Sequence, residues 1–129
     1  MKVIRRSSKD TKWQEVKREV YDRDKGVCRL CKILTAKEFL TLRKNAGSMI
    51  KSLDPAHYKA VSHRPDLCYE PNNICMVNHY SHSMLDDNKS PIDGTYITLE
   101  EVEAWWIRIL KGNPAQYEYL EKLGVFENE

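Results

Sequence analysis

Apolar side chains near the start of the chain recur at intervals of three and four residues, as one buried face of a helix requires: Trp13, Val16 and Val20. Asp10 or Thr11 can cap the start of this helix, which we expect to run to about Arg23. Gly26 follows shortly after and suits a left-handed turn that ends a helix.

Two further regions have the same helical period. Residues 35–52 place apolar side chains on one side and most lysines and arginines on the other, so we expect a second helix there. Thr98 with Glu101 three positions later is typical of a capping box and opens a helix to about Lys111. Its expected apolar face contains Leu99, Val102, Trp106, Ile109 and Leu110. A last short helix should follow residues 112–114.

The middle of the chain predicts strands instead. Residues 53–60 and 74–77 are short apolar runs beside prolines and asparagines, and residues 61–72 between them have the composition of a loop. A helix should begin near Asn78 and end at about Asp86. The order strand, loop, strand, helix predicts an α+β fold built on a hairpin that a helix follows.

We interpret the 129 residues as one domain with short flanking segments. The expected parts are a basic arm at 1–11, the main domain at 12–111 with its ββα core at 53–87, and a short helix with an acidic tail at 112–129. No apolar run approaches the roughly 20 residues that cross a bilayer. The charged first residues lack the apolar segment of a signal peptide, so we expect a cytoplasmic protein with no membrane association.

The net charge of +2 conceals an uneven distribution. Residues 1–64 contain 17 Lys/Arg and 7 Asp/Glu, whereas residues 65–129 contain 4 and 12. A basic half is what binding to a polyanion such as DNA needs, although each cation alone is more simply a solvated side chain. The candidates for phosphate contacts are Arg5, Arg6, Lys12, Arg43, Lys44 and Lys51.

Four cysteines raise the question of a structural Zn²⁺. Cys28 and Cys31 have the two-residue spacing with which two thiolates in a turn bind one metal ion, as in a zinc knuckle. Cys75, together with Cys68 or His79, could complete the set, and four cysteines are the favoured combination. The alternative is that Cys68 and Cys75 are ordinary buried thiols.

The residues with the most chemistry lie between positions 54 and 86. His57 would end the first strand and is the candidate general base, while Asn73 could fix the position of that histidine. His82 and Asp86 are four residues apart, so on a helix they share a face and can bind one divalent cation. Asp54 or a backbone group could complete the metal shell. Such a site suits hydrolysis of a phosphodiester with Mg²⁺ or Mn²⁺.

These features together resemble the HNH, or ββα-metal (His-Me finger), endonucleases. The stretch from Trp13 to Cys31 resembles their N-terminal half, and residues 54–57 (Asp-Pro-Ala-His) resemble their first motif. Asn73 and His82 have the family's separation of nine, and Leu85-Asp86 resembles a phage-associated branch. The resemblance covers about residues 12–87. It implies a DNA endonuclease with His57 as base, His82 as metal ligand, one catalytic divalent ion and 5′-phosphate products.

The chain differs from many HNH endonucleases at three points, one of which is the long connection from Cys31 to His57 that the 35–52 helix causes. Ala56 stands where an acidic residue or histidine often precedes the base, and Asn78 and Ser81 stand where a second Cys-x-x-Cys is common. A second hypothesis is therefore a zinc-knuckle DNA-binding or adaptor protein without turnover. A third is a structure-selective nuclease that acts with a phage recombination or packaging partner in the host cytoplasm. The helix at 35–52 and the acidic C-terminal part would then bind that partner.

Overall fold

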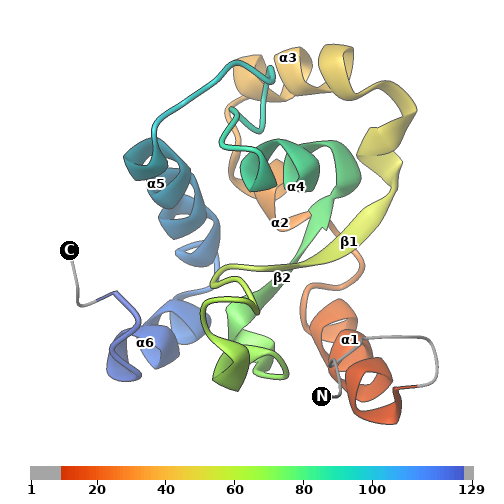
Figure 1. The fold of residues 1–129 in the computed structure, drawn as a ribbon. Helices are drawn as coiled ribbons and strands as arrows, with labels where there is room; N and C mark the ends of the chain where they lie inside the picture. The colour runs from red at the N-terminus through yellow and green to blue at the C-terminus, as the bar shows by residue number, and fades with distance from the viewer. Residues whose placement is uncertain (1–9, 127–129) are drawn as a thin grey trace.

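A two-stranded antiparallel sheet forms the centre of the protein, in a computed structural model that describes residues 10–126. Strand β1 (Leu53–His57) pairs with β2 (Ile74–Asn78), and helix α4 (His79–Asp86) begins at the residue after β2. Figure 1 shows this hairpin and helix surrounded by further helices. The expected α+β fold with the order strand, strand, helix is confirmed.

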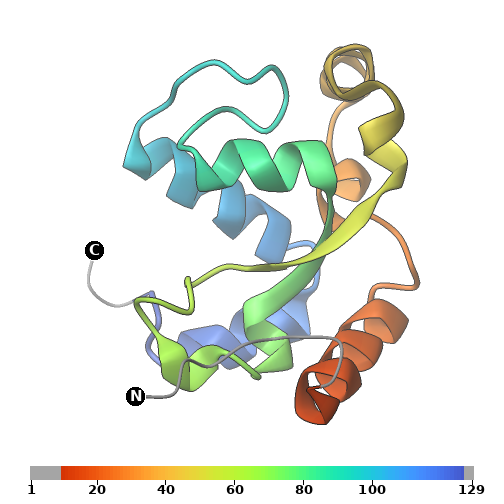
Figure 2. The same cartoon turned by 45° about the vertical axis from the view of Figure 1, so that its right-hand side comes forward.

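The other helices enclose the hairpin. Figure 1 places α3 at the top, α1 at the bottom right, and α5 and α6 on the left, and the turned view in Figure 2 keeps α3 and α1 at opposite ends. No helix within the described part of the chain is long and apolar enough to cross a membrane. The bounds are α1 (Thr11–Arg23), α2 (Arg29–Ile33), α3 (Ala36–Ala46), α5 (Leu99–Leu110) and α6 (Pro114–Lys122), with short 3-10 turns η1 (Gly47–Lys51), η2 (Pro65–Leu67) and η3 (Pro71–Asn73).

Strand β2 is buried at all five of its residues, because other elements cover both faces of the hairpin. Ile74 and Met76 pack on the face that α1 covers, where they meet the expected helical stripe of Trp13, Val16 and Val20. Cys75 and Val77 point to the other face and enter the main core with residues of α2, α3, α5 and α6. The predicted apolar face of α5 is confirmed except at Leu99, which is 72% exposed.

Three expected elements have different limits. The helix predicted at 35–52 ends at Ala46, because Gly47 takes a positive φ of 57° and a 3-10 turn follows. The strand predicted at 53–60 ends at His57, because the N–H and C=O of Lys59 bond to the Asn73 side chain and not to a strand. The expected cysteine turn is the start of α2, which Cys28 caps.

A buried ionic network connects the helices to the sheet. Asp24 accepts hydrogen bonds from Arg23 Nε (2.8 Å), Arg29 Nη1 (3.1 Å) and the Met76 N–H (2.9 Å). Arg29 is only 4% exposed and also donates to Gln116 Oε1 at 2.7 Å. Residues of α1, α2, β2 and α6 are thereby fixed to one another around a single carboxylate.

We expect Asp24→Ala to lower the free energy of unfolding by about 3 kcal/mol at pH 7, because it leaves the buried Arg29 without its counter-charge. Burial by itself would raise the pKa of Asp24, but hydrogen bonds from Arg23 and Met76 and the two arginine charges outweigh it, so the pKa is lowered. The contribution of Asp24 is therefore present above the pKa of an unfolded aspartate and declines as the pH falls through the folded value.

Urea unfolding at pH 7 and at acid pH measures this difference. The matched control is Asp22→Ala, which removes an exposed carboxylate from the same helix end and should change stability by less than about 0.5 kcal/mol. Equal effects of the two substitutions would contradict the role given to Asp24.

Candidate active site

One carboxylate oxygen of β1 accepts hydrogen bonds from two histidines of α4. Asp54 is the second residue of β1, and α4 starts directly after the strand that pairs with it. His79 Nδ1 lies 2.7 Å and His82 Nδ1 2.8 Å from Asp54 Oδ2. The three-residue spacing puts both rings on the side of α4 that faces β1.

The same helix supplies a second carboxylate one turn later. His82 Nε2 lies 3.4 Å from Asp86 Oδ2, so the expected pairing across positions i and i+4 is present. Contacts therefore run from His79 through Asp54 and His82 to Asp86. From the sequence, His79 is considered only as a zinc partner of Cys75, so the contact of Asp54 with both histidines is not predicted. Their spacing on one helical face is the signal that could have revealed it.

The pKa of the Asp54 carboxyl is lowered. Its partial burial opposes ionisation, but the hydrogen bonds from His82 and His79 and the charges of these rings outweigh the burial. Asp54 thus carries a full negative charge at neutral pH. A negative oxygen beside two imidazoles is a donor set that divalent transition cations accept.

Asp54, His79 and His82 are residue types that bind divalent cations, but their side chains are not arranged as a metal-binding shell. Within residues 10–126, no three or more His, Cys, Asp or Glu side chains are arranged as a metal shell. The reason lies in the contacts themselves, because both imidazoles point a protonated Nδ1 at Asp54 Oδ2, and a proton occupies the place that a cation would take. Metal binding at these residues would require displacement of those protons or a turn of the rings.

His57 ends β1 and is held from two sides. Its ring stacks on Trp13 of α1, with centroids 5.5 Å apart and planes 17° apart. Nε2 lies 2.9 Å from the carbonyl oxygen of Cys68. Since a carbonyl only accepts, Nε2 donates the hydrogen bond to it. The Trp13 stack and this hydrogen bond together fix the orientation of the ring.

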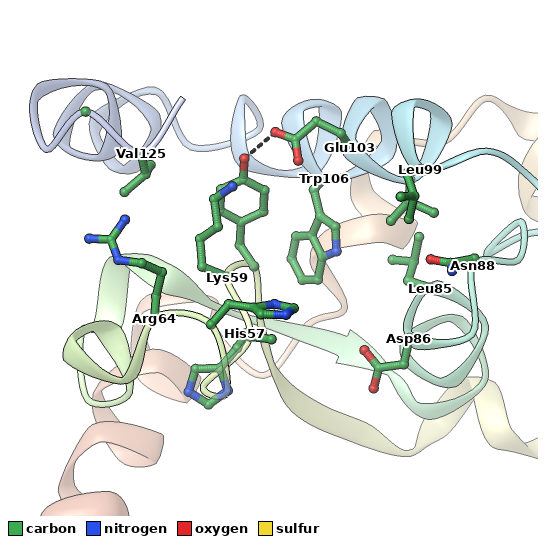
Figure 3. Close-up of a pocket in the computed structure, with 15 residues that line it drawn as sticks. His57, Lys59, Arg64, Leu85, Asp86, Asn88, Leu99, Glu103, Trp106 and Val125 are labelled. Atoms are coloured by element: carbon green, nitrogen blue, oxygen red, sulfur yellow. Dashed lines mark hydrogen bonds between the residues drawn. The ribbon is translucent and has the colours of Figure 1, made fainter. Parts of the chain in front are cut away.

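His57 and Asp86 both line a cavity of about 750 Å³. Figure 3 shows them along its lower side, with Lys59 and Arg64 at the left and Glu103 and Trp106 descending from α5. Lys59 and Arg64 belong to the segment that follows β1, while Asp86 ends α4. The cavity therefore has both the candidate base and Asp86 in its lining, with the cations Lys59 and Arg64 on one wall, whereas Asp54, His79 and His82 are not among its lining residues.

Asn73 holds the loop behind His57. Its side chain is fully buried and makes two hydrogen bonds to the backbone of Lys59. Oδ1 accepts from the Lys59 N–H at 2.8 Å, and Nδ2 donates to the Lys59 carbonyl at 3.0 Å. Nδ2 also donates to the carbonyl of Leu67 at 3.2 Å. Asn73 thus acts on His57 through the loop, since the Cys68 carbonyl that contacts the ring follows Leu67 directly.

The four cysteines do not converge. Cys28 Sγ accepts from the backbone N–H of Asn78 at 3.2 Å, and Cys31 Sγ lies 3.9 Å from Asn78 Nδ2. Cys75 Sγ instead lies 3.4 Å from Gln116 Nε2, and burial raises the pKa of its thiol. The structure thus does not assemble the four-cysteine zinc site. Cys68 and Cys75 are buried thiols, as the alternative interpretation has it.

The side chain of Asn78 occupies the space beside Cys28 and Cys31. Its Nδ2 also donates to Ser81 Oγ at 3.0 Å. Asn78 and Ser81 are the two positions at which the resemblance noted from the sequence would lead one to expect a second cysteine pair. Two thiols, an amide and a hydroxyl therefore face one another here.

The candidate DNA-binding cations do not form one patch. Lys12 lies on α1, whereas Arg43 and Lys44 lie on α3 and Lys51 on η1, and α1 and α3 lie at opposite ends of the molecule (Figures 1 and 2). All four side chains are exposed, as phosphate contacts require. Arg5 and Arg6, with most of the expected basic arm, lie outside the described residues.

Comparisons with known proteins assign no family. No family model matches the chain, and no curated protein or solved structure matches it either. The fold and the site define an α+β protein in which a hairpin and the helix after it carry an aspartate with two histidines. Any more particular assignment depends on the side-chain geometry described above.

We expect Asp54→Asn to lower the free energy of unfolding at pH 7 by about 1–2 kcal/mol, because the hydrogen bonds from His79 and His82 lose their charged acceptor. The lowered pKa of Asp54 sets the sign of the pH dependence. Its contribution is complete above the pKa of an unfolded aspartate, and the two proteins should approach equal stability as the pH falls through the folded value.

Chemical unfolding between pH 7 and pH 3 tests this. Asp86→Asn is the control, since that side chain is 67% exposed and should contribute little. A stability difference for Asp54→Asn that stays constant over this range would contradict the assigned charge interaction.

Proposed function

We propose that this protein is a metal-dependent DNA endonuclease of the ββα-metal, or HNH, type. The observation that carries the proposal is the contact of Asp54 on β1 with His82 on α4, extended by His82 to Asp86. Asp86 shares a cavity with His57, the candidate base. A base, an acidic ligand set and a hairpin–helix scaffold are thus combined in one region.

Asp54, His82 and Asp86 are the residues that would hold the cation, and His79 is an additional candidate. Two carboxylates with imidazole nitrogen suit Mn²⁺ well and Mg²⁺ acceptably. When bound, such an ion offsets the charge that develops on the phosphoryl oxygens and on the leaving oxygen.

His57 would remove a proton from the attacking water. The Cys68 carbonyl keeps the proton on Nε2, and the Trp13 ring restricts the plane of the imidazole. A positioned base of this kind typically contributes about 10²–10⁴-fold to a rate. Asn73 is a positioning residue, because it fixes the loop that carries the Cys68 carbonyl.

DNA would be bound mainly through its phosphates. Lys59 and Arg64 stand on the cavity wall, and Lys12, Arg43, Lys44 and Lys51 are exposed on surrounding helices and turns. Contacts of this type carry little sequence information, so binding should weaken steeply as salt rises.

A non-catalytic DNA-binding adaptor is the second candidate. One observation favours it, since Asp54, His79 and His82 are hydrogen-bonded to one another and no three His, Cys, Asp or Glu side chains within residues 10–126 form a metal shell. The fold and the phosphate contacts would be the same in both cases, and turnover separates them.

Nicking of supercoiled plasmid with Mn²⁺ or Mg²⁺, and with EDTA, distinguishes the two candidates. We expect metal-dependent nicking that His57→Ala reduces at least about 100-fold, because the base that activates water is lost. His63→Ala is the matched control, since His63 lines the same cavity and has no assigned role in the reaction. That variant should keep most of the activity.

Circular dichroism and gel-shift binding show whether the His57→Ala variant is folded and binds DNA. Full nicking activity in this folded variant would contradict the role of His57 as the general base. Absence of cleavage by the unmodified protein on duplex, nicked, branched and single-stranded DNA, with binding retained, would establish the adaptor instead.

A further inference from the structure

Cys28 and Cys31 form a pair of thiols that the proposed active site does not use. Cys28 caps α2, and its Sγ accepts the N–H of Cys31 at 3.4 Å. A hydrogen bond between the two thiols is the leading cause of the lowered pKa of Cys28 and of the raised pKa of Cys31. Both sulfurs also lie within 3.9 Å of one nitrogen, Asn78 Nδ2, so the two thiols share a polar partner.

Asn78 supports negative charge on this pair. Its backbone N–H and its Nδ2 point at Cys28 Sγ, at 3.2 and 3.5 Å, and Nδ2 lies 3.9 Å from Cys31 Sγ. All of these groups are donors. The sulfur of Cys28 therefore lies among N–H groups that stabilise a thiolate, with the Cys31 thiol as its proton donor.

The spacing also permits a bond between the sulfurs. Cα atoms three residues apart in a helical turn are about 5 Å apart, and a disulfide spans Cα atoms at roughly 4.4–6.8 Å. Cys28 is 5% exposed, while Cys31 is half-buried, so a reagent reaches Cys31 first. The shared partner Asn78, the spacing and the access of Cys31 together suit a dithiol that can be oxidised.

We propose that Cys28 and Cys31 are a redox modification site, at which a low-molecular-weight disulfide such as glutathione disulfide converts the two thiols to an intramolecular disulfide. Cys31 attacks one sulfur of the reagent as its proton passes to Cys28, which forms a mixed disulfide and releases one thiolate. That thiolate takes the proton from Cys28. Cys28 then attacks Cys31 Sγ and expels the second thiolate, so the protein loses two electrons and the reagent gains them.

Oxidation would change the hydrogen bonding at the start of α4, the helix that carries His79 and His82. Asn78 caps α4 by accepting the Ser81 N–H at 2.9 Å, and His79 and His82 lie in the first turn of that helix. A disulfide sulfur is uncharged and accepts hydrogen bonds poorly, so Asn78 Nδ2 keeps only Ser81 Oγ as a good acceptor when the pair is oxidised. The redox state should therefore alter the start of α4.

The test uses the full reduced chain incubated with excess glutathione disulfide, quenched with an alkylating reagent and mapped by mass spectrometry. We expect the intact mass to fall by two hydrogen atoms and the peptide map to link Cys28 to Cys31. Cys68 and Cys75, which are buried apart, should be alkylated only after denaturation. Amide NMR shifts of Asn78 and His79 should move in the oxidised protein.

Three variants sharpen the test. Cys68→Ala should keep the disulfide, whereas Cys31→Ser, which keeps a hydroxyl donor beside Cys28, should give none. Asn78→Asp preserves the helix cap but replaces the donor to sulfur with a carboxylate oxygen, so oxidation should slow several-fold.

The site would be disproved if Cys28 and Cys31 both remained alkylatable after treatment, or if a stoichiometric zinc ion in the purified protein held both thiols. A disulfide that forms without any shift at Asn78 and His79 would disprove the connection to α4. None of these readouts involves DNA cleavage, so they test the redox proposal independently of the nuclease proposal.

Discussion

The register of β1 against β2 decides where the reactive side chains of this protein lie. Asp54 pairs with Val77, and the hydrogen bond from the His79 N–H to the Ser52 carbonyl at 2.7 Å continues the pairing into the start of α4. Because side chains alternate along a strand, a slip of one residue would turn Asp54 to the opposite face. Its contacts with the two histidines of α4 would then be lost.

Buried polar groups maintain this register from the outside. Asp24 accepts the Met76 N–H from β2, Asn73 holds the chain on leaving β1, and Asn78 connects the end of β2 with α2 and α4. In the described part of the chain no buried side-chain nitrogen or oxygen lacks a partner. An amide or carboxylate in such a position is costly to leave unpaired, so each of these residues selects one arrangement of the backbone.

The two halves of the proposed catalytic group are held in different ways. His57 is held by the stack on the Trp13 ring and by the contact of its Nε2 with the Cys68 carbonyl. His79, His82 and the two carboxylates are fixed by one another, in a partly exposed cluster that protons hold together. A rigid base beside an adaptable acidic cluster suits a site in which a cation replaces protons on binding.

The sequence by itself determined the helices at 11–23 and 99–110, the hairpin with the helix after it, and the pairing of His82 with Asp86. Each depends on local periodicity, capping or the spacing of one helical turn. Only the tertiary structure decided that Asp54 contacts His79 as well as His82, that Cys75 lies apart from Cys28, and that Arg29 meets Gln116. These partners are separated by 25 residues or more, and their meeting depends on strand register and helix packing, which no local pattern encodes.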